Sequence, residues 1–194
     1  MVLVRSVGSA ALLIAGGPLL AQSAAITESD SAFSFTMNGS TMRVTRSGPS
    51  CPSSCIQPMR AAAGVETFGE LEVIDFLQNP VSDGSGLLID VRMPATFSAG
   101  SVPGAVNVPV RTFRPDNPYR SDLLSALGVQ TAESSPGFAK AFTLVIFGSG
   151  PDDADATAVI GHLLDAGYPA GKIGYYRGGA ARWSALGLNT EVGQ

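Results

Sequence analysis

The chain has 194 residues, of which 45 % are hydrophobic and 14 % are charged, and its formal net charge is −4. This length and composition support one packed domain with a sizeable core and exclude a wholly disordered chain. An acidic chain without a basic run is poorly suited to bind nucleic acid or an anionic membrane surface.

The first residues have the pattern of a secretory signal peptide. Arg5 precedes an apolar run over 7–20, and small residues follow from Ala21 to Ala24. The run is shorter than the about 20 residues of a membrane-spanning helix, so it favours a cleaved signal over 1–23, with an uncleaved anchor as the alternative. We therefore expect an exported protein, in the periplasm, without a membrane span in the mature chain.

Residues 24–64 are expected to form a linker, a β-hairpin and a cysteine-containing loop. Asn38-Gly39 is a strong signal for a two-residue turn, since both positions tolerate a positive φ. Pairing across this turn places Phe35 opposite Met42 and Phe33 opposite Val44 on one face. A face of this kind can pack on a core, and we interpret the hairpin as an N-terminal appendage.

Helices and strands alternate along 65–190. Thr67 to Glu70 has capping-box spacing and predicts a helix that Asn79-Pro80 ends. Short apolar runs predict strands over 87–91, 105–109, 143–147 and 172–176, and helices are expected over 119–127 and 180–186 and along the apolar stripe from Ala156 to Leu164. This alternation predicts an α/β fold with a mainly parallel sheet flanked by helices.

Three segments of 65–188 resemble signatures of the rhodanese-like domain family. The first runs from Leu88 to Pro109, the second joins Leu163 to Gly167-Tyr168, and the third joins Arg177 to Trp183. The signature residues of the first and third segments are Asp90, Arg92, Gly104, Gly178, Gly179 and Trp183. The resemblance implies a rhodanese-like fold, to which the N-terminal hairpin is an appendage.

The loop that should carry the family's catalytic cysteine departs from the pattern. In active members, a cysteine is the first residue of a tight loop at a helix N-terminus, and the backbone N–H groups of that loop surround its sulfur. Its thiolate accepts sulfur from thiosulfate or a persulfide donor. The corresponding residues are Gly148, Ser149, Gly150, Pro151, Asp152 and Asp153, and no cysteine is present in either plausible alignment. Carboxylates suit a helix start but repel sulfur anions. Ser101 also replaces a common histidine of the family.

Other chemistry at this loop is weakly supported. Ser149 lacks the spacing of a nucleophile elbow, and His162, the only histidine, is roughly 15 Å along the helix from Asp152. The glycines do not complete a dinucleotide fingerprint. Asp152, Asp153 and Asp155 can be read as a cation site or as a helix cap, and we favour the cap. No metal or cofactor is expected.

Cys51 and Cys55 carry the remaining candidate chemistry. Pro52 suits the first position of a helical turn, which would make Cys51 its N-cap with a depressed pKa. A structural disulfide is the preferred interpretation. A redox or persulfide-carrying pair and a Cu(I) site that includes Met59 stay open.

Two hypotheses follow, and whether the protein is an enzyme stays open between them. The first is an exported rhodanese-like module without conventional thiosulfate sulfurtransferase activity, which acts as a binding or accessory protein. The second is a sulfurtransferase or thiol-redox protein that uses Cys51 and Cys55. The expected partner is a small sulfur compound or another protein.

Overall fold

The computed structural model describes residues 32–48, 56–131 and 136–192. The predicted signal peptide and both cysteines lie outside these residues, so the expectations for them stay predictions. Within the described part of the chain, no helix combines the length and the apolar character that crossing a membrane requires.

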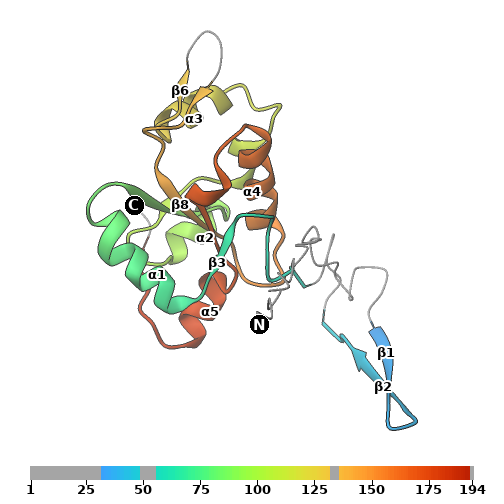
Figure 1. Cartoon of the computed structure of the whole chain (residues 1–194). Helices are drawn as coiled ribbons and strands as arrows, with labels where there is room; N and C mark the ends of the chain where they lie inside the picture. Colours follow the sequence, from blue (N-terminus) through green and yellow to red (C-terminus); the bar gives the residue numbers. More distant parts are fainter. Residues whose placement is uncertain (1–31, 49–55, 132–135, 193–194) are drawn as a thin grey trace, which may run out of the picture.

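Five parallel strands form the central sheet, in the order β3-β9-β8-β4-β5 (Figure 1). The strands are β3 (Glu66–Phe68), β4 (Gly86–Asp90), β5 (Val106–Asn107), β8 (Thr143–Phe147) and β9 (Ile173–Tyr176). The prediction of a mainly parallel sheet is confirmed. The central strands β8 and β4 are almost wholly buried, and this explains why their sequences are continuous apolar runs.

Helices cover both faces of the sheet and enclose two cores. The helical elements are α1 (Glu70–Phe76), η1 (Leu77–Val81), α2 (Pro94–Ala99), η2 (Val110–Phe113), α3 (Arg120–Ala126), α4 (Asp155–Asp165), η3 (Ala170–Lys172) and α5 (Gly179–Ala185). The face that bears Val145 and Phe147 packs against α1 and α5, and the face that bears Leu144 and Ile146 packs against α3 and α4. A short ribbon of β6 (Gln130–Thr131) and β7 (Pro136–Gly137) follows α3.

The first helix begins two residues later than the capping-box prediction placed it, and that prediction is wrong. Thr67 belongs to β3, and its hydroxyl donates to the carbonyl of Met59 instead of capping a helix. The N-cap of α1 is Gly69, whose N–H donates to Glu72 Oε2 at 2.9 Å. The acidic side chain that closes the helix start is therefore Glu72, three residues beyond Gly69.

Asn79-Pro80 does not end the helical path, contrary to the prediction. The chain passes through the π-helical turn η1, with Pro80 inside it. Pro80 has no N–H to donate, but Asn79 Nδ2 donates to the Asp75 carbonyl at 3.0 Å. The side-chain amide thus satisfies a carbonyl of the last α-helical turn, and the wider turn accommodates the proline ring.

The N-terminal hairpin has the predicted register, and its apolar face is largely exposed. β1 (Ala32–Met37) and β2 (Ser40–Thr45) pair so that Phe35 faces Met42 and Phe33 faces Val44. These four side chains share one face, yet each is 39 to 46 % exposed. Figure 1 shows the reason, because the hairpin projects away from the sheet and its helices.

The buried carboxylate of Asp90 connects the carboxyl end of β4 to the chain that follows it through hydrogen bonds. Asp90 is fully buried and accepts hydrogen bonds from Arg92 Nη2 at 2.6 Å and Ser101 Oγ at 2.7 Å. Arg92 Nε and the Arg92 backbone N–H also donate to this carboxylate, at 2.9 to 3.0 Å. Asn107 Nδ2 then donates to the carbonyls of Asp90 and Arg92. Every oxygen of the carboxylate is satisfied, and β5 is held beside β4.

Replacing Asp90 with alanine is expected to destabilise the domain by about 3–5 kcal/mol, because it leaves the buried guanidinium of Arg92 without its counter-charge. The double variant Asp90→Leu/Arg92→Met removes both charges and is expected to cost less than Asp90→Ala alone. Urea denaturation of the three proteins measures the difference. A double variant that is less stable than Asp90→Ala would contradict this account of the pair.

Candidate functional site

The loop between β8 and α4 holds a carboxylate of its own among its backbone N–H groups. Asp153 Oδ2 accepts a hydrogen bond from the Ser149 N–H at 2.7 Å, and Asp153 Oδ1 accepts one from the Asp155 N–H at 2.9 Å. Asp153 also donates its N–H to the Gly150 carbonyl at 3.1 Å. The Asp155 N–H opens α4, so the helix dipole adds to the charge-assisted bond that Asp153 accepts there.

The N-cap of α4 is Ala154, which has no side-chain cap, and the Asp153 carboxylate accepts the N–H of Asp155 at the first helical position. The Asp153 carboxylate is bound by N–H groups of its own loop. Asp152 is exposed, and Asp155 is the first residue of α4. Within the described residues, no group of three or more histidine, cysteine or acidic side chains is arranged to hold a metal ion. His162 lies in the last turns of α4, half-buried, away from the loop at the other end of that helix.

The start of α5 supports the loop from the opposite side. The Ala180 N–H donates to the Gly148 carbonyl at 3.1 Å, and the Ala181 N–H donates to the Ser149 carbonyl at 2.9 Å. Gly179 makes this approach possible: its φ is +61°, and a Cβ there would lie 2.6 Å from the Gly148 carbonyl oxygen. A side chain at position 179 would therefore force the loop away from α5.

The other signature residues have structural positions, some of them at this junction and some elsewhere in the domain. Gly178 directly precedes α5, and Trp183 is buried in the core below it, with its indole N–H donating to the Asn189 carbonyl at 2.7 Å. Gly104 lies in the turn before β5. Arg92 forms an ion pair with Asp90, so its charge is not available to the 148–155 loop.

A residue that the sequence analysis did not select completes the site. Gln57 is buried, its N–H donates to the Pro151 carbonyl at 2.7 Å, and its own carbonyl accepts from Arg177 Nε at 3.1 Å and Nη2 at 3.0 Å. Its side-chain oxygen accepts from the Thr157 hydroxyl at 3.0 Å. The segment that begins at residue 56 is thus fastened to the loop, to α4 and to the end of β9.

Tyr175 lies in the core between these elements and stays neutral. Its hydroxyl is buried and, among the described residues, has no hydrogen-bond partner. Burial, opposed by the charge of Arg177 and reinforced by the charge of Asp153, raises the pKa of Tyr175 to about 12. A phenol held neutral in this way does not supply the nucleophile that the loop lacks.

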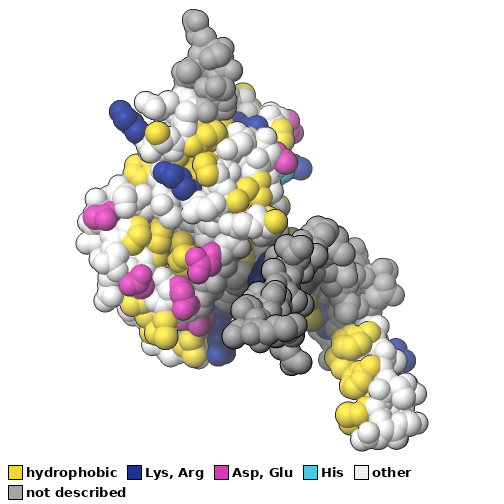
Figure 2. Space-filling view, in the orientation of Figure 1, with side chains coloured by type: hydrophobic (Ala, Val, Ile, Leu, Met, Phe, Trp, Pro, Cys, Tyr) yellow, Lys and Arg dark blue, Asp and Glu magenta, His cyan; other side chains and the backbone are white. Residues whose placement is uncertain are grey.

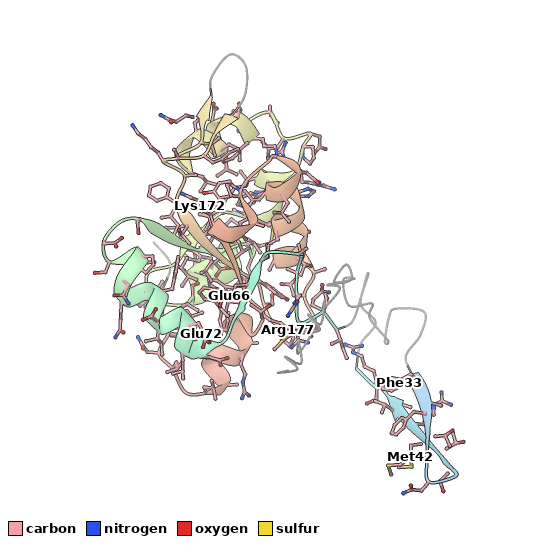
Figure 3. The ribbon with its side chains drawn as sticks, viewed as in Figure 1. Phe33, Met42, Glu66, Glu72, Lys172 and Arg177 are labelled. Atoms are coloured by element: carbon pink, nitrogen blue, oxygen red, sulfur yellow. The ribbon has the colours of Figure 1, made fainter. Side chains whose placement is uncertain are left out.

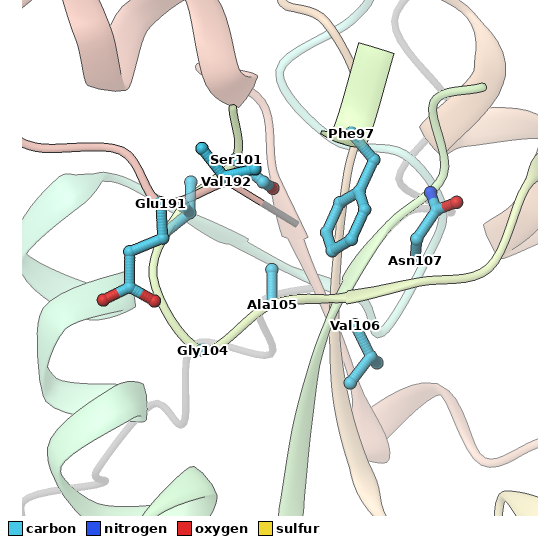
Figure 4. A pocket seen from close by; sticks show the side chains of 9 residues that line it. Phe97, Ser101, Gly104, Ala105, Val106, Asn107, Glu191 and Val192 are labelled. Carbon is cyan, nitrogen blue, oxygen red and sulfur yellow. The ribbon is translucent and has the colours of Figure 1, made fainter. Parts of the chain in front are cut away.

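Two pockets lined by described residues lie away from this loop. One, of about 320 Å³, is shown in Figure 4 and lies beside β5, between Phe97, Ser101 and Glu191. The other, of about 540 Å³, lies between β3 and α1. Neither includes a residue of the 148–155 loop.

Gly179→Ala should destabilise the domain by more than Gly187→Ala. Both glycines have a positive φ, but a Cβ at position 187 meets nothing within 4 Å. The control, Gly187→Ala, should therefore lose only roughly 1–2 kcal/mol of stability, because alanine is strained in the left-handed conformation. Gly179→Ala has the same strain and, in addition, a steric clash with the Gly148 carbonyl oxygen. Urea denaturation measures both variants, and equal losses would contradict the role given to Gly179.

The pH dependence of stability should differ in sign between two aspartates. Burial, and then the charge of Asp153, raise the pKa of Asp155, while hydrogen bonds from the Ser85 hydroxyl and N–H lower the pKa of Asp83. Between its ordinary and raised pKa, Asp155 binds more protons in the folded state, so its ionisation costs stability as pH rises through that window. Asp83 behaves oppositely, and its stabilisation is lost as pH falls through its lowered pKa.

Asp155→Asn is therefore expected to gain stability relative to the unsubstituted protein as pH rises from about 3.5 to 7. Asp83→Asn is expected to lose relative stability as pH rises through the lowered pKa of Asp83 towards its ordinary value of about 4. Thermal denaturation at several pH values compares the two, and parallel curves would contradict the assigned shifts.

Comparisons with known proteins identify the family to which this fold belongs. A family model described as "Rhodanese-like domain" matches residues 73–186, which is more than half of the chain. No curated protein matches the chain.

Several solved structures are similar to the chain. The Alr3790 protein from Anabaena sp. is 22% identical, with 62% of this chain and 77% of that chain covered and a TM-score of 0.42. RPA3614 from Rhodopseudomonas palustris, described as a possible tyrosine phosphatase, is 17% identical over 68% and 88%, with a TM-score of 0.49. Thiosulfate sulfurtransferase from Pseudomonas aeruginosa is 19% identical over 70% and 22%, with a TM-score of 0.45. The extent of the family match shows that the chain belongs to the rhodanese-like domain family.

Proposed function

We propose that this protein is an exported rhodanese-like module that binds a partner or small sulfur compound and does not carry out thiosulfate sulfurtransferase chemistry at its 148–155 loop. The observation that carries the proposal is the Asp153 carboxylate, which accepts hydrogen bonds from the Ser149 and Asp155 N–H groups. These amides are the donors that an anionic sulfur species would need.

Charge and composition support the same conclusion. Sulfur transfer from thiosulfate requires a thiolate that attacks the outer sulfur and releases sulfite, and residues 148–155 contain no cysteine. Thiosulfate would also approach the charge of Asp153 and of the exposed Asp152. The signal-like pattern over residues 1–23 supports the exported location.

The contacts of Gln57 favour a second candidate function, in which Cys51 and Cys55 carry sulfur or electrons. Gln57 follows Cys55 by two residues and is hydrogen-bonded to Pro151 and Arg177. Two peptide units span at most about 7 Å, so the chain can bring Cys55 near the 148–155 loop. The Arg177 guanidinium lies at the same junction and would favour a thiolate.

A thiosulfate:cyanide sulfurtransferase assay tests the first candidate. The unsubstituted protein is expected to show no more turnover than the double variant Cys51→Ser/Cys55→Ser, because neither protein has a thiol in the loop. An active rhodanese serves as the positive control for the assay.

Turnover above that of the double variant would overturn the first candidate and support the second. Intact-mass spectrometry after treatment with a persulfide donor separates them further. A mass increase of one sulfur atom (about 32 Da) that is absent from the double variant would identify a persulfide on the cysteine pair.

A further inference from the structure

The methionines of the described part of the chain all lie on its surface. Their exposed fractions run from 43 to 58 %, and they are Met37, Met42, Met59 and Met93. Among the described residues, none of the buried hydrophobic side chains is a methionine. Methionine is more often an interior residue, because its flexible thioether fills gaps in a core. The described thioethers of this chain are instead soft donor atoms that a ligand in solution can reach.

Two of these thioethers are brought to one place by the register of the hairpin. Phe35 is paired with Met42, and Met37 lies two residues after Phe35 on β1. Side chains two residues apart on a strand point to the same face, so these three side chains share one face of the hairpin. Met37 and Met42 are diagonal neighbours across the strand pair, at about 7–8 Å. Because methionine has three rotatable bonds, both sulfurs can turn toward one ion.

The turn next to Met37 fixes this register. Asn38 and Gly39 both have a positive φ, of 52° and 76°, as a two-residue type I′ turn requires. Figure 2 shows hydrophobic side chains along one side of the hairpin, and Figure 3 shows Met42 nearer the turn than Phe33. The two thioethers therefore lie at the end of the hairpin that is farther from the sheet and its helices.

The donor atoms decide which class of ion could bind there. Thioether sulfur is a soft ligand that favours Cu(I), whereas Mg²⁺ and Ca²⁺ require oxygen ligands such as carboxylates. The segment 32–48 contains no aspartate, glutamate, histidine or cysteine, so it offers none of the charged or imidazole ligands of harder ions. Arg43 lies on the opposite face of the hairpin. The ring of Phe35, directly across from Met42, can attract a cation through its π-system.

We propose that Met37 and Met42 form a surface site for a soft monovalent cation of the Cu(I) class, with the ring of Phe35 beside the ion. Both sulfur donors are neutral at every pH, so binding releases no proton from them. The site uses no residue of the 148–155 loop, and it does not depend on Cys51 or Cys55.

Titration with Ag(I), an ion of the same class as Cu(I) that does not change oxidation state in air, tests the site. The parent protein is the full chain with Cys51→Ser/Cys55→Ser, because thiolates bind soft ions and would compete with the thioethers. In chloride-free buffer this parent should bind one equivalent of Ag(I) by isothermal titration calorimetry. The methyl NMR signals of Met37 and Met42 should shift on binding, and that of Met93 should not.

Three substitutions in the same background separate this site from other thioethers. Met37→Leu and Met42→Leu should each weaken Ag(I) binding at least about tenfold, because each removes one of two donors and keeps the apolar volume. Met93→Leu is the matched control and should leave the affinity unchanged, since Met93 is also exposed (51 %) but lies at the N-cap of α2.

A fourth variant tests whether the two thioethers must share a face. Thr36→Met/Met37→Leu keeps the number of methionines but moves one to the opposite face of β1. It should bind Ag(I) as weakly as Met37→Leu.

Two results would overturn the site. One is a cysteine-free parent that binds no Ag(I). The other is binding that Met37→Leu and Met42→Leu leave unchanged, or that Thr36→Met/Met37→Leu retains in full, since the ion would then not depend on this pair.

Discussion

The hydrogen bonds from the Ser149 and Asp155 N–H groups to the Asp153 carboxylate hold the loop between β8 and α4 in one conformation. They give a loop of backbone donors an internal anion, at the place where the family fold concentrates positive potential. Two of the loop's N–H groups are therefore already bound to a carboxylate of the loop itself. A thiol added to it would face a carboxylate, which favours the protonated form over the nucleophilic thiolate.

The elements around the loop depend on the same arrangement. The first turn of α5 donates to the Gly148 and Ser149 carbonyls, while Asp153 binds the loop's N–H groups from the other side. Gln57 adds a third support through Pro151 and Arg177. Because these supports come from segments far apart in the sequence, the loop conformation is a property of the whole domain and not of residues 148–155 alone.

Sequence patterns predicted the elements whose burial is local, and missed those that depend on distant partners. β8 and α4 follow from a continuous apolar run and a helical stripe. β3 has three residues and is stabilised by pairing with β9, so no local pattern marks it. The contacts of Gln57 use mainly its backbone, which any residue type supplies, and the Asp153 cap was expected only as a preference of aspartate for helix starts. The hairpin register followed from its turn, but the exposure of its apolar face did not.

The pairing of β3 with β9 also sets where the domain can be shortened. The family match begins at residue 73, after β3 and Gln57. A chain cut there would lose the strand that covers β9, and the N–H and C=O groups along that side of β9 would face solvent. Arg177 would lose the carbonyl that its guanidinium binds. Such a fragment would expose β9 as an unpaired edge strand next to the charge of Arg177, so edge-to-edge aggregation would compete with folding.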